Sequence, residues 1–253
     1  EQTYPTCLWT PELLRDFVGD YLGPTLRERG VNSEIWFGTM SAPQDAQHVA
    51  AVMADATSAP YIKGIGVQWN TLNSVAGFAS SYGLPIMQTE HRCGNYPWVT
   101  AAFNVEQAPN DQAYAEESWG FITQWIRAGV NSYSAWNMVL DTVGMNLDVG
   151  RPWPQNALLV VDRAARTLQV TPAYFVFRHL SQFVDPGAQR IGTSGDADAL
   201  AFRNPDGSIV TVVYNEDVSA RDMTLGVNAA SLRFSVPARG WATLNWPATP
   251  TAL

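Results

Sequence analysis

A short polar run follows a predicted buried strand near the middle of the chain. The mostly apolar stretch 85–89 comes after the breaker Gly83 and predicts this strand. Glu90, His91 and Arg92 follow it directly. Because α/β barrels place catalytic groups at the carboxyl ends of parallel strands, Glu90 is a candidate catalytic carboxylate. A solvated turn after a strand would explain the same residues, so the rest of the sequence has to decide between the two interpretations.

Three other predicted strands, residues 34–38, 61–69 and 131–136, also end in residues suited to a sugar site. Trp faces can stack on pyranose rings, and Gln and Asn amides can both donate to and accept from hydroxyl groups. Core packing remains an alternative role for each Trp. The residues predicted to bind substrate beside Glu90 are Gln68, Trp69, Asn70, His91, Trp136 and Asn137.

Other reactive side chains near Glu90 have less specific roles. We interpret His91 as a hydrogen-bonding neighbour of the carboxylate, since no Ser or Cys nucleophile pattern accompanies it. Arg92 either lowers the pKa of a neighbouring carboxylate or is an ordinary solvated residue. Cys7 and Cys93 fall in strand-end loops, where a disulfide or two buried thiols would fit. The His and Cys residues lack metal-ligand spacing, so we expect no metal and no cofactor.

Composition narrows the class of protein. The chain has 253 residues, of which 46% are hydrophobic, enough for one barrel-sized domain or two smaller ones. Its net charge of −8 argues against nucleic acid as a partner. No window of eighteen apolar residues occurs, so we expect no membrane span.

Helical patterns alternate with the four predicted strands. Thr10-Pro11-Glu12 is a helix start, and that helix is expected to stop near Gly23-Pro24 or, after a kink, at Gly30. Further helices are predicted at 43–57, 72–82 and 111–128. This alternation is typical of a parallel sheet with crossover helices.

The pattern changes after Trp136. A loop rich in Gly, Asn and Pro is expected to run to Asn156, before a strand at 158–161 and a capped helix at 171–183. Short strands predicted at 199–203, 208–214, 223–227, 231–236 and 241–246 indicate an antiparallel sandwich. We therefore expect a partial barrel at 1–157 and a β-sandwich domain at 158–253, which contains the connecting helix.

The order and spacing of several short motifs make the chain resemble glycoside hydrolase family 30, the glucosylceramidase-like retaining β-glycosidases. The resemblance runs from about Tyr4 to Trp246. Its anchors are Tyr4-Pro5 with Cys7, Phe17 with 22–26, 64–67 before Trp69, Thr89-Glu90 with Cys93-Gly94, Trp136-Asn137, Pro172, Tyr174, 179–181 with Phe183, Pro186-Gly187 and Gln189-Arg190. The family fold is a (β/α)8 TIM barrel with a β-sandwich built from both ends of the chain.

The resemblance implies a double-displacement mechanism in which Glu90 is the nucleophile. The family's acid/base glutamate lies in an Asn-Glu-Pro motif, which this resemblance places upstream of Glu1. The chain would then hold strands five to eight of the barrel and most of the sandwich. Gln68 stands where glucosylceramidases usually carry His, and Asn70 lies near a usual Tyr, so the sugar stays open. The resemblance also favours a secreted or extracytoplasmic protein.

Two functional hypotheses from different classes follow. The first is a retaining glycosidase whose isolated chain lacks the acid/base group. The second is a non-catalytic carbohydrate-binding or structural fragment. A third interpretation, an unrelated α/β protein with a β tail, conflicts with the continuous order of the anchors. A half barrel would expose the edges of strands five and eight, so we expect poor stability or dimerisation through these edges.

Overall fold

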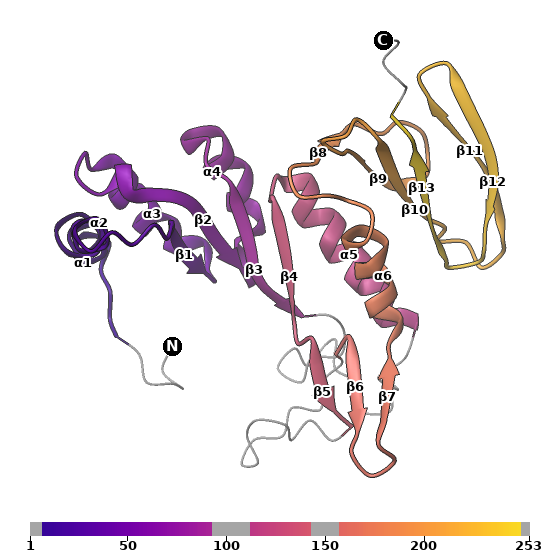
Figure 1. Ribbon diagram of the computed structural model, residues 1–253, viewed down its shortest axis with the longest axis horizontal. Coiled ribbons are helices and arrows are strands. Elements are labelled where there is room, and N and C mark those ends of the chain that lie inside the picture. The colour runs from indigo at the N-terminus through magenta and orange to yellow at the C-terminus, as the bar shows by residue number, and fades with distance from the viewer. Residues whose placement is uncertain (1–6, 93–111, 143–156, 249–253) are drawn as a thin grey trace. The chain divides into compact units, whose positions relative to one another are not determined.

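The computed structural model describes residues 7–92, 112–142 and 157–248 (Figure 1). The chain divides into two compact units. The first is Glu1–Arg92 with Gly120–Trp136, and the second is Cys93–Trp119 with Asn137–Leu253. Helix α5 (Gln112–Ala128) contributes residues to both units. The domain boundary that we expect at residue 157 stays a prediction.

Four parallel strands form the sheet of the first unit. They are β1 (Ile35–Met40), β2 (Ile62–Gln68), β3 (Ile86–Arg92) and β4 (Ser132–Trp136). They pair in the order β1-β2-β3-β4, so neighbours in sequence are neighbours in space. The predicted fold class is confirmed: a parallel α/β sheet of four strands is followed by antiparallel β-structure. Parallel pairing puts the carboxyl ends of the strands, and the residues after them, at one edge of the sheet.

The first helical stretch runs through a Gly-Pro pair without stopping. It consists of α1 (Pro11–Asp16), a π-helical segment η1 (Phe17–Leu22) and α2 (Gly23–Glu28). The Thr10 hydroxyl accepts the Leu13 N–H at 3.2 Å, which confirms the predicted N-cap. The N–H of Gly23 reaches back to the Val18 carbonyl, a π-helical spacing. The helix thus continues past Pro24, whose missing N–H falls at the start of α2.

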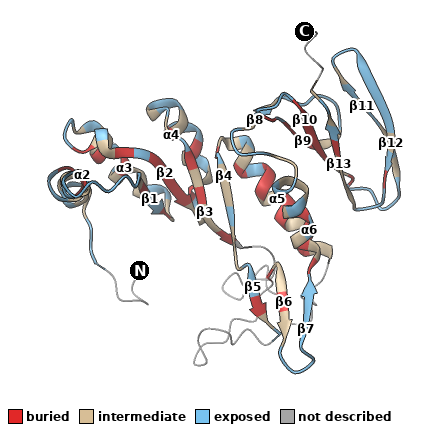
Figure 2. Cartoon of the chain, in the orientation of Figure 1, coloured by how far each residue is buried: buried red, intermediate tan, exposed pale blue. Residues whose placement is uncertain are grey.

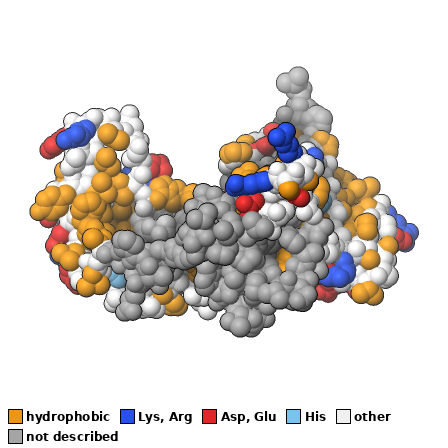
Figure 3. All heavy atoms as spheres, turned by 90° about the horizontal axis from the view of Figure 1, so that it is seen from below, with side chains coloured by type: hydrophobic (Ala, Val, Ile, Leu, Met, Phe, Trp, Pro, Cys, Tyr) orange, Lys and Arg blue, Asp and Glu red, His pale blue; other side chains and the backbone are white. Residues whose placement is uncertain are grey.

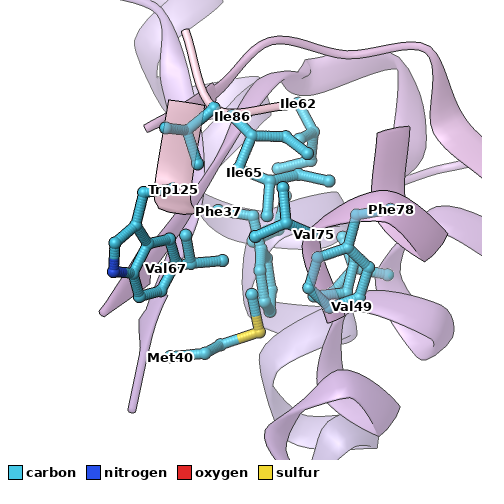
Figure 4. Close-up of a cluster of buried hydrophobic side chains, with 13 residues drawn as sticks. Phe37, Met40, Val49, Ile62, Ile65, Val67, Val75, Phe78, Ile86 and Trp125 are labelled. Carbon is cyan, nitrogen blue, oxygen red and sulfur yellow. The ribbon is translucent and has the colours of Figure 1, made fainter. Parts of the chain in front are cut away.

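The remaining helices of the first unit cover one face of the sheet. They are α3 (Ala46–Ala54), α4 (Val75–Tyr82) and the second half of α5, with the short 3-10 helices η2 (Pro43–Asp45), η3 (Ala59–Tyr61) and η4 (Trp69–Ser74). Figure 4 shows the buried cluster that they form with the strands. Ile65 of β2, Val75 of α4 and Trp125 of α5 are among its fully or almost fully buried members. Burial of these apolar side chains holds the helices against the sheet.

A group of exposed apolar side chains lies at the N-terminal end of the first unit. Leu8 is 90% exposed and Tyr21 is 65% exposed. Trp9, Leu13 and Phe17 are also exposed, and the Trp9 and Phe17 rings lie 5.2 Å apart. In Figure 3 hydrophobic side chains gather on this unit. The spacing of four residues puts Leu13, Phe17 and Tyr21 on one side of the helical stretch. Together with Leu8 and Trp9, which come just before it, we call them the N-terminal apolar stripe.

Besides the first part of α5, the described residues of the second unit form one further helix and three sheets. The helix is α6 (Pro172–Ser181). One antiparallel sheet has the order β13-β10-β9-β8, and a second joins β11 to β12. A third sheet has the order β5-β6-β7, in which β5 and β6 are parallel. The strands are β5 (Val139–Asp141), β6 (Leu159–Asp162), β7 (Thr167–Val170), β8 (Gln189–Ile191), β9 (Asp198–Arg203), β10 (Ile209–Tyr214), β11 (Arg221–Val227), β12 (Ala230–Val236) and β13 (Trp241–Trp246).

The strands of the second unit differ in how they are buried. Figure 2 shows β9 and β10 largely buried and β7 and β12 largely exposed, whereas β11 alternates between half-buried and exposed residues. Strands β11 and β12 form a hairpin whose two-residue turn is Asn228-Ala229. Asn228 has a positive φ of 54°, which Asn tolerates better than most residues.

Candidate functional site

The carboxyl end of β1 contains an extra residue and strained backbone. Gly38 pairs with Gly66 and Met40 pairs with Val67, so Thr39 is the extra residue of a β-bulge. Gly38 has a φ of 93° and Thr39 a φ of 103°. A β-carbon on Gly38 would lie 2.9 Å from the Gly66 carbonyl oxygen, so only glycine fits there. Positive φ at the β-branched Thr39 is uncommon, and strain of this kind is typical of functional sites.

The turn after β2 is fastened to the end of β1. The Gln68 Nε2 atom donates to the Thr39 carbonyl at 2.9 Å, and the Asn70 N–H donates to the Ser41 carbonyl at 3.2 Å. Trp69, between them, has a positive φ of 45°. Gln68 therefore makes a backbone contact through the amide that we expected to bind substrate. Asn70 is exposed.

Glu90 lies near the carboxyl end of β3, where the sequence predicts a catalytic group. It pairs with Gln68 of β2, and it is half-buried. A carboxylate that is partly shielded from water but still accessible can act as a nucleophile or as a general base. The register thus brings the candidate nucleophile next to the strand end that carries Gln68 and Trp69.

Aromatic rings surround His91, the neighbour of Glu90. Its imidazole centroid lies 4.1 Å from that of Phe121 and 5.2 Å from that of Trp69. Trp125 lies 6.2 Å away, and His91 is only 7% exposed. The Trp69 ring also meets the Trp136 ring edge to face, with centroids 6.2 Å apart. These five rings form a continuous aromatic cluster within the first unit.

The structure brings most of the predicted site residues to one edge of the sheet. Gln68, Trp69, Asn70, Glu90, His91 and Trp136 all belong to the first unit, at or just after strand ends. Asn137 belongs to the second unit, where its carbonyl accepts the Leu158 N–H at 3.3 Å. The Arg92 side chain and Cys93 lie outside the described residues, and Cys7 is exposed.

Residues that the sequence did not single out also shape this edge. Phe121 and Trp125 of α5 pack around His91, although the sequence predicted only a helix at 111–128. Gln88 is fully buried in β3. Gln88 could have been noticed in the sequence, because it is a polar residue inside the mostly apolar run 85–89. The end of the first predicted strand falls near Thr39, but no signal marked its positive φ, which contradicts the intrinsic preference of Thr.

Neither a metal site nor a spanning helix occurs in the described part of the chain. No three His, Cys, Asp or Glu side chains at residues 7–92, 112–142 and 157–248 are grouped as metal ligands. Within the same ranges, no helix has both the length and the apolar character that a bilayer crossing needs.

Comparison with known proteins agrees with this architecture. Residues 187–244 match the glycosyl hydrolase family 30 beta sandwich domain. The lysosomal acid glucosylceramidase of Mus musculus is 26% identical over 247 residues, covering 91% of this chain and 46% of that protein. The chain thus spans about half the length of the curated relatives it matches.

Solved structures share the fold. SrfJ from Salmonella typhimurium superposes with a TM-score of 0.81 at 21% identity, over 96% of this chain and 54% of SrfJ. An endo-β1,6-glucanase superposes with a TM-score of 0.76 at 21% identity, over 94% of this chain and 54% of the glucanase. In sequence and fold, this chain is similar to the C-terminal portion of glycoside hydrolase family 30 proteins.

Proposed function

We propose that the chain is the nucleophile-bearing portion of a retaining β-glycosidase and that Glu90 is the nucleophile. The observation that carries this proposal is the position of Glu90 at the carboxyl end of a parallel strand, beside Gln68 and next to the aromatic cluster. The named relatives, a glucosylceramidase and an endo-β1,6-glucanase, support a glycoside as substrate.

The proposed reaction has two displacements. The Glu90 carboxylate attacks the anomeric carbon, and the bond to the leaving oxygen breaks as a second carboxylic acid gives that oxygen a proton. The product is a glycosyl ester on Glu90. The second group, now a carboxylate, takes a proton from water, which attacks the same carbon and releases Glu90. In retaining enzymes the two carboxyl groups stand about 5–5.5 Å apart.

The aromatic cluster would bind and orient the sugar. Trp69 and Trp136 are half-exposed, and their edge-to-face arrangement presents two differently directed faces. An indole face buries the apolar face of a pyranose ring and leaves its hydroxyl groups to polar neighbours. Asn70, exposed beside Trp69, can donate to and accept from such hydroxyls.

A non-catalytic role in carbohydrate binding is the second candidate. The Trp69 and Trp136 pair favours it, because stacking on sugars requires no carboxylate. The two functions predict different chemistry at Glu90, although both predict sugar binding at the same strand ends. A secreted or extracytoplasmic location stays a prediction for either function.

Covalent trapping tests the catalytic proposal. The purified protein is incubated with activated 2-deoxy-2-fluoro glycosides of several sugars, and intact mass and peptide mapping follow. We expect one label, on Glu90, from the reagent whose sugar matches the site. Glu90→Gln should take no label, because an amide cannot form the ester, whereas Glu28→Gln, an exposed change in α2, should label normally.

Each remaining outcome has a definite meaning. A label on another carboxylate would refute the assignment of Glu90. Sugar binding without any label, in the chain alone and with the rest of a family 30 barrel supplied, would favour the non-catalytic function.

A further inference from the structure

Strand β3 carries one residue more than both of its neighbours, immediately before Glu90. Against β2, Val67 pairs with Gln88 and Gln68 with Glu90, so Thr89 is the extra residue. Against β4, Gln88 pairs with Tyr133 and His91 with Ala135, again one residue too many on β3. A β-bulge of this kind redirects the side chains that follow it.

The bulge decides which face Glu90 occupies. Ile86 belongs to the buried cluster under the helices, and Gln88, two residues on, is 0% exposed. His91 packs on Phe121 and Trp125 of α5, so it also faces the helices. Gln88 and His91 thus share a face although they are three residues apart, which an unbroken strand forbids. Glu90, next to His91, is turned to the opposite face.

Two side chains tie this bulge to the strands on either side. The Gln88 Oε1 atom accepts the Ser134 N–H of β4 at 2.9 Å. The Thr89 hydroxyl donates to the Val67 carbonyl of β2 at 3.2 Å, a longer and weaker bond. A bulge disrupts the backbone ladder, and both ties lie where the ladder is disrupted. Gln88 lies in a fully buried position, so its amide has few alternative orientations.

A glutamine side chain also joins two strands at another bulge of the sheet. Thr39 is the extra residue of β1, and the Gln68 amide of the neighbouring strand donates to its carbonyl. In both places a glutamine side chain bridges two strands at the irregular point. Both glutamine bridges therefore lie at irregular strand ends.

We propose that Gln88 is a positioning residue for Glu90, with Thr89 as its weaker counterpart. The inference rests on the proposed function of Glu90. Gln88 touches no substrate and acts only by holding the bulge, which keeps the Glu90 carboxylate pointed at the anomeric carbon. Nucleophilic attack requires reacting atoms about 3–3.5 Å apart and aligned, so a small rotation of Glu90 slows the attack more than it weakens binding.

The first test uses Gln88→Met, which keeps the buried volume and removes the acceptor. With the rest of a family 30 barrel supplied, we expect kcat and the rate of Glu90 labelling by a fluoroglycoside to fall at least about tenfold. We expect KM to stay within about threefold, because the sugar-stacking faces are unchanged. The matched control is Gln124→Met, an exposed change on α5, which should leave both constants unchanged. Unchanged kcat and labelling in folded Gln88→Met would overturn the proposal.

A second readout does not depend on activity. The carboxyl carbon of Glu90 is followed by NMR through a pH titration, and exchange of the Ser134 amide is measured in the same samples. We expect Gln88→Met to speed Ser134 exchange and to shift the Glu90 titration, whereas Gln124→Met does neither. Faster Ser134 exchange with an unchanged Glu90 titration would reduce Gln88 to a purely structural role. If the unaltered protein takes no label even with the rest of a family 30 barrel supplied, the glycosidase proposal fails, while this titration still decides whether Gln88 positions Glu90.

A second pair of variants tests the proposal if Gln88→Met does not fold. Thr89→Val removes the hydroxyl and keeps the shape, and Thr89→Ser keeps the hydroxyl. We expect slower labelling and a shifted Glu90 titration in Thr89→Val and a return toward normal in Thr89→Ser. Equal behaviour of the two variants would contradict the role of the Thr89 tie.

Discussion

The guanidinium of Arg239 binds both carboxylate oxygens of Glu116, joining the turn before β13 to the first half of α5 within the second unit. The Arg239 carbonyl also accepts the Gln112 Nε2 donor at 2.7 Å. The pKa of Tyr214 is raised by burial first and then by its hydrogen bond to Glu116. One arginine thus fixes two residues of α5 to the β-structure of this unit.

Replacing Arg239 by Lys should weaken this attachment, because an ammonium cannot form the paired bonds of a guanidinium. We expect a loss of about 1 kcal/mol in the free energy of unfolding, since the pair is only partly shielded from water. Urea unfolding measures the loss. Arg233→Lys, on the exposed strand β12, is the control and should change nothing. Equal stability of the two variants would show that the paired geometry contributes nothing.

Trp136→Ala should weaken sugar binding more than it weakens folding. The Trp136 ring is half-exposed and meets Trp69 at its edge, so its removal leaves no large buried cavity. We expect an affinity loss of about 1 kcal/mol or more, measured by calorimetry with the sugar that labels the protein. Trp9→Ala, in the N-terminal apolar stripe, provides the comparison. A large drop in melting temperature with unchanged affinity would make Trp136 a core residue.

His179 should make the stability of the protein depend on pH. The pKa of His179 is lowered, mainly by burial and secondly by the charge of Arg178. The Nδ1 atom of His179 lies 2.7 Å from the Thr243 hydroxyl oxygen. As the pH falls below about 6.5, the unfolded chain takes up this proton before the folded one does. Neutral His179 therefore contributes its full stabilisation of the folded state above about pH 6.5. This stabilisation is lost as the pH falls toward the lowered pKa of His179 in the folded protein.

Urea unfolding at pH 7.5 and 5.5 measures this effect. We expect a smaller difference between the two pH values in His179→Gln, which cannot titrate, than in the unaltered protein. In Arg178→Gln the difference should shrink too, though less. The same difference in all three proteins would assign the pH dependence to other groups.

The outer strands of the parallel sheet should make the chain associate. Among the described residues, β1 and β4 each pair on one side only, and an unpaired strand edge can join another chain. The N-terminal apolar stripe adds exposed aromatic surface to the same unit. We expect light scattering after size exclusion to show dimers or larger species of residues 1–253, with association that increases with concentration. A monomer that melts cooperatively would contradict this prediction.

The regular part of the fold could be predicted because its patterns are local. The β-branched and glycine residues of β2 and the helical stripe around Trp125 show their periods directly in the sequence. Parallel pairing then brings Trp69, Glu90 and Trp136 to one edge without further information. Strand β7 could not be found in this way, since all four of its residues are exposed and no alternation marks it.

The irregular part depends on contacts that the sequence does not display. Thr39 and Thr89 are extra residues only relative to the facing strands, so no local pattern reveals either bulge. Strict alternation would have put Gln88 and Glu90 on the same face. The π-helical segment η1 likewise carries the helix through Gly23, where a β-carbon would lie 2.4 Å from the Tyr61 ring. The predicted stop at Gly23 was therefore wrong, and the alternative end near Gly30 was closer.

The exposed hairpin of β11 and β12 gives the experimenter a place to attach labels. Its turn, Asn228-Ala229, is exposed and belongs to the second unit, whereas Glu90 and the aromatic cluster belong to the first. Exposed turns of this kind accept inserted sequence with little effect on the surrounding backbone. An epitope or a fluorescent domain inserted between these two residues would make the protein traceable and immobilisable through a segment that takes no part in the proposed chemistry.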